Sequence, residues 1–339
     1  AQPRCMTSLF RRIIERIGQR PLPEPGAPGD VLAGARPDNI DVVIFQMGKV
    51  ASTAIAAGLG RSGLHTLQAH VACPGRLAEK LHTIANPALA EEVATRVYQD
   101  FLLELRVMYL LARIRRNAGA RSGPKIITPV RDPVSWYWSH FAEMYDHYRG
   151  LLLRYWQAQG GAAESFEPRG VFLQLLERMF ALLERTAAPL DSVAGVARLQ
   201  QEANELDPSN VLASQVNRFL VPLRWFDEDF LPATGVDVYG HPFDIAGGFS
   251  RLQEGGFAVL LLQYERLGSL VGQLESFTGA SALDLGRENA SEDKAIPFDV
   301  VQMQQAGLER MSPALVERIY NCRYPRHFGY LPPGGDTAP

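Results

Sequence analysis

DVVIFQMGKVAST, residues 41–53, joins a short apolar run to a segment with helical character. The run at residues 41–45 is apolar and β-branched and ends at a polar loop, which is typical of a buried strand in a parallel sheet. Between Ala51 and Leu59 the apolar residues recur at helical spacing. These residues therefore predict a strand, a loop over residues 46–50 and a helix, in that order.

The loop contains Gly48 and Lys49, and two hydroxyl side chains, Ser52 and Thr53, follow it. Backbone N–H groups at the start of a helix form an anion site, and an ammonium with two hydroxyls would complete a phosphate cradle. A Walker A loop needs G-x-x-x-x-G-K-[ST], but Val43 stands where its first glycine belongs and another valine follows the lysine. The sequence thus predicts a phosphate loop that is not the ATP and GTP motif. An ordinary strand-to-helix turn is the alternative.

The alternation of strands and helices continues along the chain. We predict further strands at residues 63–70, 125–130 and 257–263, and further helices at residues 87–117, 267–277 and 313–320, the last of them the final helix. Residues 140–220 read as helical throughout, with a break at Gly160-Gly161, and we interpret them as a large insertion or lid. Strands separated by helices predict an α/β fold with a P-loop-like parallel sheet flanked by helices. Such sheets bind ligands at the carboxyl ends of their strands.

The N-terminal region has a different character. Residues 9–17 have helical periodicity, and residues 20–30 contain four prolines and two glycines, a composition typical of a linker. We therefore predict a helix and linker over residues 1–38 and one domain over residues 39–339. No apolar stretch approaches the roughly 18 to 20 residues of a membrane span. We expect a cytoplasmic protein, in which contact with the inner membrane face, if any, is limited to the N-terminal helix.

Charge and cysteine content exclude further classes. The formal net charge of −3 supports no interaction with nucleic acid. The three cysteines, Cys5, Cys73 and Cys322, are widely separated and form no C-x-x-C pair. A disulfide scaffold and a zinc site are therefore not expected, and we predict no metal.

A second strand-to-helix junction follows the strand predicted at residues 125–130. Arg131 is followed by Asp132 and Pro133, which suit the N-cap and the first position of a helix. Ser139 comes two turns later. An arginine at a helix start can also brace the end of a strand, and this interpretation stays open.

Taken together, the two junctions resemble those of the sulfotransferases that use 3′-phosphoadenosine-5′-phosphosulfate (PAPS). In that superfamily a strand-loop-helix with a lysine followed by Ser or Thr binds the 5′-phosphosulfate, and an R-D-P element with a serine eight residues beyond the arginine binds the 3′-phosphate. The resemblance covers residues 41–330 and looks closest to the bacterial branch described as putative capsular polysaccharide synthesis proteins. It implies PAPS as co-substrate, its product 3′-phosphoadenosine-5′-phosphate (PAP), and these nucleotide-binding residues: Gly48, Lys49, Val50, Ala51, Ser52, Thr53, Arg131 and Ser139.

Other segments support the resemblance, and one residue departs from it. Residues 225–227, 236–239 and 327–330 look like the same branch, as does Asn289 with Lys294, from which the resemblance implies a phosphate contact of Lys294. A solvated lysine is the equal alternative for that residue. Ala51 occupies a position where the family loop usually has glycine. Because a Cβ disfavours left-handed backbone, alanine suits this position only if its φ is negative and the sulfate does not need the space of the methyl group.

The acceptor hydroxyl also needs a base. Gln68-Ala69-His70-Val71 follows a predicted strand and is similar to the H-x-H-V segment of uronosyl sulfotransferases, whose second histidine is the base. We therefore assign His70 as base and Lys49 as the group that stabilises the transferring sulfuryl, with Glu143 as the alternative base. A histidine with a purely structural role is the other interpretation of His70. Glu265, after the strand at residues 257–263, is expected to brace local backbone.

These residues predict a sulfotransferase that acts on a hydroxyl of a saccharide or another natural product. Two alternatives remain open at this point. One is a P-loop-like nucleotide kinase, which the missing Walker A glycine disfavours. The other is a catalytically degenerate binding protein of the same fold, which is suggested by Ala51.

Overall fold

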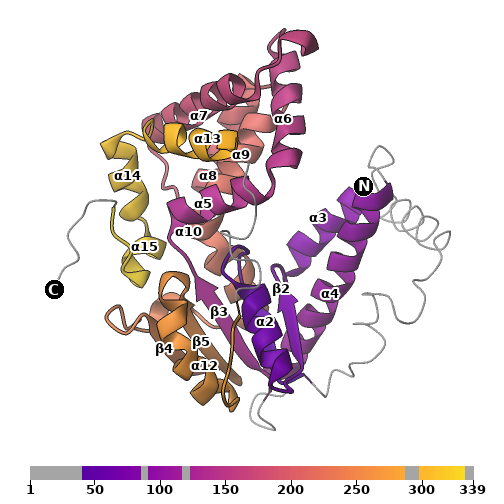
Figure 1. Cartoon of the computed structure of the whole chain (residues 1–339), viewed down its shortest axis with the longest axis vertical. Helices are drawn as coiled ribbons and strands as arrows, with labels where there is room; N and C mark the ends of the chain where they lie inside the picture. The colour runs from indigo at the N-terminus through magenta and orange to yellow at the C-terminus, as the bar shows by residue number, and fades with distance from the viewer. Residues whose placement is uncertain (1–39, 85–90, 117–122, 287–297, 333–339) are drawn as a thin grey trace.

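The computed structural model describes residues 40–84, 91–116, 123–286 and 298–332 (Figure 1). A five-stranded sheet lies at its centre, with strand order β2-β1-β3-β5-β4. Its strands are β1 (Val42–Phe45), β2 (Thr66–Ala69), β3 (Lys125–Val130), β4 (Phe249–Glu254) and β5 (Phe257–Gln263).

Helices alternate with the first strands and then dominate the middle of the chain. The helices around the sheet are α2 (Ser52–Arg61), α3 (Pro74–Ile84), α4 (Glu91–Arg116) and α12 (Val271–Thr278). The helices between β3 and β4 are α5 (Pro133–Glu143), α6 (Tyr145–Ala158), α7 (Pro168–Arg185), α8 (Val193–Leu206), α9 (Val211–Phe219), α10 (Val221–Trp225), a π-helical turn η4 (Phe226–Phe230) and α11 (Leu231–Thr234). The last helices are α13 (Phe298–Leu308), α14 (Pro313–Tyr320) and α15 (Arg323–Phe328).

Four of the five strands run parallel. β1 lies between β2 and β3, with Val43 opposite Leu67 on one side and Ile126 on the other. β3 pairs in parallel with β5. The predicted α/β fold with a sheet flanked by helices is therefore confirmed.

The two faces of the sheet pack against different helices because successive strand residues point to opposite sides. Val42 and Ile44 belong to a cluster with Ile55 of α2 and Leu274 of α12. The neighbouring residues of β1 belong to a larger core that includes α4 and the helices between β3 and β4. Figure 1 shows α2 and α12 on one side of the strands and the α5–α10 helices beyond their ends.

The prediction of a wholly parallel sheet is wrong at one edge. β4 pairs antiparallel with β5 through the hairpin turn at Gly255 and Gly256, whose φ angles are 59° and 86°. Two consecutive residues with positive φ make the tight turn that joins antiparallel strands. The alternation in β4, buried at Ser250 and Leu252 and exposed between them, was the sequence signal for this strand.

Most other element predictions are confirmed, with three differences. α5 begins as predicted, since Asp132 caps it by accepting from the N–H of Ser135 at 2.8 Å. α3, α10, α11 and α13 were not predicted, the helix expected at residue 267 begins in 3₁₀ form, and α15 follows the helix expected to be the last. The two-residue turn between α14 and α15 hides that boundary from periodicity alone.

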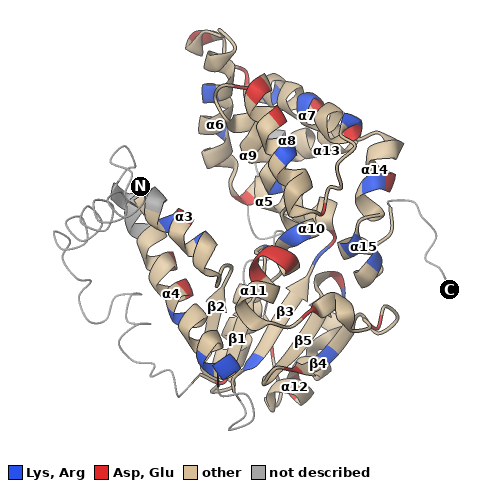
Figure 2. Ribbon diagram, turned by 180° about the vertical axis from the view of Figure 1, so that it is seen from behind, with Lys and Arg blue, Asp and Glu red and all other residues tan. Residues whose placement is uncertain are grey.

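Several predictions fall on residues outside the described ranges. These are the N-terminal helix and linker, Cys5, Asn289 and Lys294. Cys73 and Cys322 are both free and buried. In the described part of the chain, no helix combines the length and apolar composition that a membrane span requires. Figure 2 shows charged residues mainly on helices and loops, with the strands largely uncharged.

Gly307 in α13 provides a test of how closely this helix packs on α5 and α7. A Cβ at residue 307 would overlap the ring of Trp138 and approach Leu176. We predict that Gly307→Ala lowers the free energy of unfolding by about 1 to 3 kcal/mol, because the packed core cannot accept added volume. Chemical denaturation measures this change. Gly150→Ala is the matched control: a Cβ there meets nothing within 4 Å, so stability should rise by about 0.5 to 1 kcal/mol. Equal effects of the two variants would contradict the packing described.

Candidate anion-binding site

The two predicted junctions lie at the carboxyl ends of neighbouring parallel strands. β1 leads into residues 46–51 and β3 leads into Arg131, and these strands pair directly. The guanidinium of Arg131 donates from Nη1 to the carbonyl of Lys49 at 2.8 Å and from Nε to Ser135 Oγ at 3.3 Å. Its plane also lies over the ring of Tyr264, 4.3 Å from the centroid. The two motifs, 82 residues apart, therefore form one site.

The loop after β1 has an unusual backbone. Three of its residues have positive φ: Gly48 at 92°, Lys49 at 55° and Ala51 at 57°. The negative φ under which alanine would suit this position is therefore not found. Left-handed residues between right-handed ones turn successive N–H groups to one side, which is the backbone arrangement of anion-binding nests. Ala51 is also the N-cap of α2, and no side chain caps this helix, so its first N–H groups are available to a ligand.

Two side chains that the sequence prediction did not assign to the site hold this loop. Gln46 is fully buried; its Oε1 accepts from the N–H of Gly48, and its Nε2 donates to Ser52 Oγ at 3.0 Å. The indole of Trp136 donates to the carbonyl of Gly48 at 2.7 Å. Trp136 is buried in the core, and it also fixes the loop. The position of Gln46, directly after the strand, was the only signal in the sequence.

Lys49 extends from the loop toward α5. Its Nζ lies 2.5 Å from Oε1 of Glu143, and the side chains are 17% and 44% exposed. Lys49, predicted to stabilise charge, is thus in direct contact with Glu143, the alternative base. An anion that binds Lys49 must compete with Glu143 for it.

His70 follows β2 and faces the same loop. Its Nδ1 lies 3.0 Å from Nε2 of Gln46 and 3.1 Å from the carbonyl oxygen of Gln46. The backbone carbonyl of His70 accepts from the indole of Trp225 at 3.0 Å. Burial lowers the pKa of His70, although solvent reaches part of the residue, so the neutral ring is favoured.

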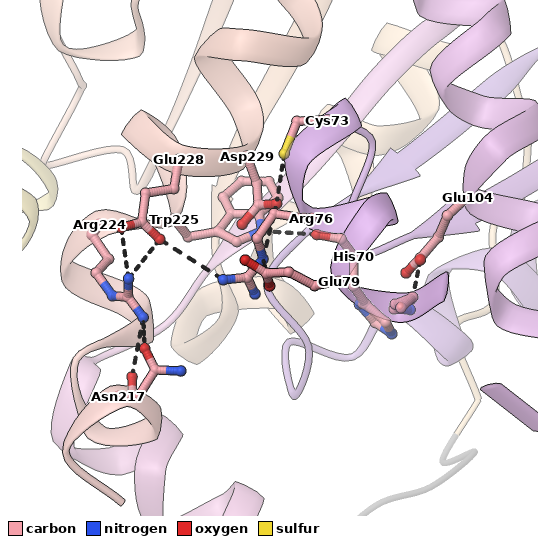
Figure 3. A network of polar contacts seen from close by, with 11 residues as sticks. His70, Cys73, Arg76, Glu79, Glu104, Asn217, Arg224, Trp225, Glu228 and Asp229 are labelled. Carbon is pink, nitrogen blue, oxygen red and sulfur yellow. Dashed lines mark hydrogen bonds and ion pairs between the residues drawn. The ribbon is translucent and has the colours of Figure 1, made fainter. Parts of the chain in front are cut away.

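Charged side chains of α3, α4 and η4 lie near His70, as Figure 3 shows. Lys80 of α3 lies 2.5 Å from the buried Glu104 of α4, and burial raises the pKa of Glu104 to about 7. Asp229 in the π-helical turn η4 lies 4.0 Å from Arg76 and accepts from the thiol of Cys73 at 3.7 Å. Burial raises the pKa of Asp229 to about 6.

The second junction is held by the C-terminal helices. The hydroxyl of Tyr324 accepts from the N–H of Arg131 at 3.1 Å and donates to its carbonyl at 2.8 Å. Tyr320 donates to Asp132 at 2.6 Å, and Glu265 accepts from the N–H of Asp132 at 2.8 Å. The bracing role predicted for Glu265 is confirmed. Burial raises the pKa of both carboxyl groups, and hydrogen bonds satisfy both of them.

The remaining predicted residues lie around this centre. Val50 and Ser52 are buried, whereas Thr53 is exposed on the first turn of α2. Ser139 is half-buried on α5. In the described structure the guanidinium of Arg131 bonds to Ser135 and to the loop carbonyl, not to Ser139. Ser135 therefore joins the site, one turn before the serine predicted from the resemblance.

Comparisons of the chain with protein-family models, curated proteins and solved structures found no match. Among the described residues, no group of three or more His, Cys, Asp or Glu side chains has an arrangement that could hold a metal ion. The site itself can therefore be described only by its own chemistry. It is a nest of N–H groups with one lysine, one arginine, hydroxyl groups, and a histidine and a carboxylate at its edge.

Ala51 provides a test of the loop backbone. A left-handed conformation costs an L-residue about 1 to 2 kcal/mol, and glycine removes this cost at an entropic expense of about 0.5 to 1 kcal/mol. We predict that Ala51→Gly raises the free energy of unfolding by about 0.5 to 1 kcal/mol. Ala57→Gly, in the middle of α2, is the control and should lower it by about 1 kcal/mol. Denaturant titration measures both, and a loss of stability in Ala51→Gly would contradict the positive φ.

Proposed function

We propose that this protein transfers a sulfuryl group from PAPS to a hydroxyl of a saccharide or natural-product acceptor. The observation that carries the proposal is the direct contact between the two strand-end loops, through Arg131 Nη1 and the carbonyl of Lys49. PAPS carries two separate anionic groups, the 5′-phosphosulfate and the 3′-phosphate. Two anion-binding loops side by side suit such a ligand better than they suit a ligand with one phosphate chain.

The assignment of groups follows the charges of the site. The nest at residues 48–53 takes the 5′-phosphosulfate, because it combines N–H donors with Lys49. Arg131 and the serines of α5 take the 3′-phosphate. Arg131 already donates to Lys49 O and Ser135 Oγ, and the remaining guanidinium donors are the ones assigned to the phosphate.

The proposed reaction needs little covalent chemistry from the protein itself. The acceptor oxygen attacks sulfur in line with the bond from sulfur to the bridging oxygen of PAPS, and PAP leaves with the bonding electrons. A loose transition state of this kind depends on positioning and on charge neutralisation. Lys49 stabilises the charge that develops on the bridging oxygen once it turns from Glu143 to the ligand.

The proton of the acceptor hydroxyl passes to His70 in this proposal. A histidine that acts as a base must be neutral at working pH, and burial lowers the pKa of His70 in the direction that keeps it neutral. Glu143 is the alternative base, and its contact with Lys49 at 2.5 Å supports that alternative. The helices between residues 140 and 220 are the proposed insertion that binds the acceptor.

Two further functions remain as alternatives. A nucleotide kinase would use the same loop, but the loop lacks the Walker A pattern. A degenerate binding protein of this fold would bind PAP without turnover, and the strained Ala51 is the feature that suggests it.

The first test of the proposed function is Lys49→Ala. We predict a fall in PAPS turnover well beyond tenfold, about 1.4 kcal/mol, with a smaller loss of PAP affinity, because the charge acts mainly in the transition state. Turnover is measured as PAP formation with a panel of saccharide and phenolic acceptors. Lys125→Ala is the control, since Lys125 lies at the opposite end of β3 and donates to the carbonyl of Thr278.

Three results would count against the sulfotransferase. Turnover of Lys49→Ala within about tenfold of wild type would remove the role of this lysine. Tight PAP binding by wild type without transfer to any acceptor would favour the degenerate binding protein. Stabilisation by ADP with Mg²⁺ but not by PAP, in a thermal shift assay, would favour the kinase.

Arg131→Ala tests the 3′-phosphate assignment. We predict a loss of about 2 to 5 kcal/mol in PAP affinity, because a desolvated charge pair is removed, while the affinity for 5′-AMP hardly changes. Ser139→Ala should cost nearer 1 kcal/mol, as for one hydrogen bond. Calorimetric titration of both ligands gives the difference. Equal losses for PAP and AMP would mean that Arg131 acts only by holding Lys49 O and the loop.

A further inference from the structure

The buried side chain of Gln46 contacts both the anion-binding loop and His70. Its amide accepts from the N–H of Gly48, donates to Ser52 Oγ at 3.0 Å, and places Nε2 3.0 Å from His70 Nδ1. We propose that Gln46 is a positioning residue, which links occupation of the anion-binding loop to the choice of ring nitrogen that carries the proton in His70. The proposal rests on the proposed function only for the role of His70 as base.

The hydrogen bonds of Gln46 indicate the tautomer of the ligand-free protein. Because Oε1 accepts from Gly48, Nε2 of Gln46 is the atom that faces His70. Gln46 is fully buried, so both protons of its amide need acceptors. Ser52 Oγ accepts one, and His70 Nδ1 is placed to accept the other. A ring that accepts at Nδ1 carries its proton on Nε2.

The backbone carbonyl of Gln46 offers the opposite arrangement. It lies 3.1 Å from the same Nδ1 and would accept a proton from it. That tautomer would leave one amide proton of Gln46 without an acceptor and facing the Nδ1 proton. Buried N–H groups without a partner are rarer than carbonyls without one. The Nε2–H tautomer is therefore favoured while the loop is empty.

This tautomer cannot accept a proton at Nε2, whereas the proposed base must. Among the described residues, the hydrogen bonds of His70 are at Nδ1 and at the backbone carbonyl, so Nε2 is the nitrogen open to the acceptor. His70 consequently becomes a base only when its proton moves to Nδ1.

An anion in the loop supplies the reason for that change. It attracts the N–H of Gly48, which now donates to Oε1 of Gln46, and the hydroxyl proton of Ser52, whose oxygen now accepts from Nε2 of Gln46. Oε1 of Gln46 then loses its donor. A half-turn of the amide brings Oε1 to His70, where it accepts from Nδ1–H, and turns the Nε2 protons of Gln46 toward the anion, which accepts them. Nε2 of His70 is then left with its lone pair. The base is thereby available only when the sulfuryl donor is bound.

Charges around His70 act on its protonation but do not select between the neutral tautomers in this way. Lys80 of α3 and Lys49 of the loop disfavour the imidazolium, and Asp100 of α4 favours it. Glu104 is paired with Lys80. The hydrogen-bond partners of His70 Nδ1 both belong to Gln46, so the tautomer depends on Gln46.

The experiment is a two-bond ¹H–¹⁵N correlation spectrum of the histidine rings, which separates the two neutral tautomers, with His70→Gln used to assign the signal. The samples are wild type, Gln46→Glu, Gln46→Met and the control Ser52→Ala, each alone, with PAP, and with pyrophosphate as a probe of the loop. Binding is followed by the backbone amide of Gly48. The ring signal of His140, which is hydrogen-bonded to Tyr148, shows whether each variant is folded.

We expect wild-type His70 to change from mainly Nε2–H to mainly Nδ1–H at saturating ligand, a change of at least tenfold in the tautomer ratio. The carboxylate in Gln46→Glu only accepts hydrogen bonds, and Gln46→Met leaves the backbone carbonyl of residue 46 as the acceptor for His70. In both variants His70 should therefore carry its proton on Nδ1 without ligand. In Gln46→Glu, His70 should also titrate at higher pH than in wild type, since a neighbouring carboxylate favours the imidazolium. Ser52→Ala keeps the amide of Gln46, so His70 should retain its proton on Nε2.

Some results would overturn the proposal. The first is a wild-type His70 that already carries its proton on Nδ1 without ligand, and the second is a His70 tautomer that stays unchanged while the Gly48 amide signal shows saturation with ligand. The others are folded Gln46 variants in which His70 retains its proton on Nε2, and failure of both ligands to bind. A switch with pyrophosphate but no binding of PAP would overturn the proposed function and leave the link through Gln46 supported.

Discussion

The parallel pairing of β1 with β3 is the constraint on which the site depends. It places the carboxyl ends of both strands side by side, so that the loop at residues 46–51 and the junction at Arg131 meet although they are distant in sequence. The bond from Arg131 to the carbonyl of Lys49 then joins them. Thr128 adds a second cross-link, since its hydroxyl donates to the carbonyl of Phe45 at 2.8 Å. Without this pairing, each motif would be an ordinary turn.

Strain and burial at the loop are balanced by hydrogen bonds from elsewhere in the fold. Three positive φ angles in four residues are unfavourable, and the loop keeps them because Gln46 and Trp136 hold Gly48 from two sides. The second junction is held in the same way by tyrosines of α14 and α15. The carboxyl groups of Asp132 and Glu265 are fixed there because each oxygen has a donor.

The sequence indicated the local elements with good accuracy where hydrophobic pattern and end signals agreed. β3 and β5 have the predicted bounds, and Asp132 and Pro133 begin α5 as predicted. β4 was missed because an exposed edge strand is only half apolar, and its hairpin depends on the backbone of Gly255 and Gly256. Of the candidate site, Lys49 and Arg131 were predicted for two separate anion-binding junctions, and the guanidinium of Arg131 contacts the backbone carbonyl of Lys49. Gln46, Trp136 and Ser135 were missed because their roles depend on contacts that no spacing reveals.

The amino-acid sequence by itself determined the strand-loop-helix units, the α/β class, the cap of α5 and the residues whose charges suit an anion. These properties are local, since they follow from apolar periodicity and from the chemistry of single side chains over a few residues. Only the tertiary structure decided that φ at Ala51 is positive, that Lys49 pairs with Glu143 and that Gln46 lies against His70. The physical reason is that strand pairing and core packing bring distant residues together, and the resulting hydrogen bonds stabilise conformations that each residue alone would avoid.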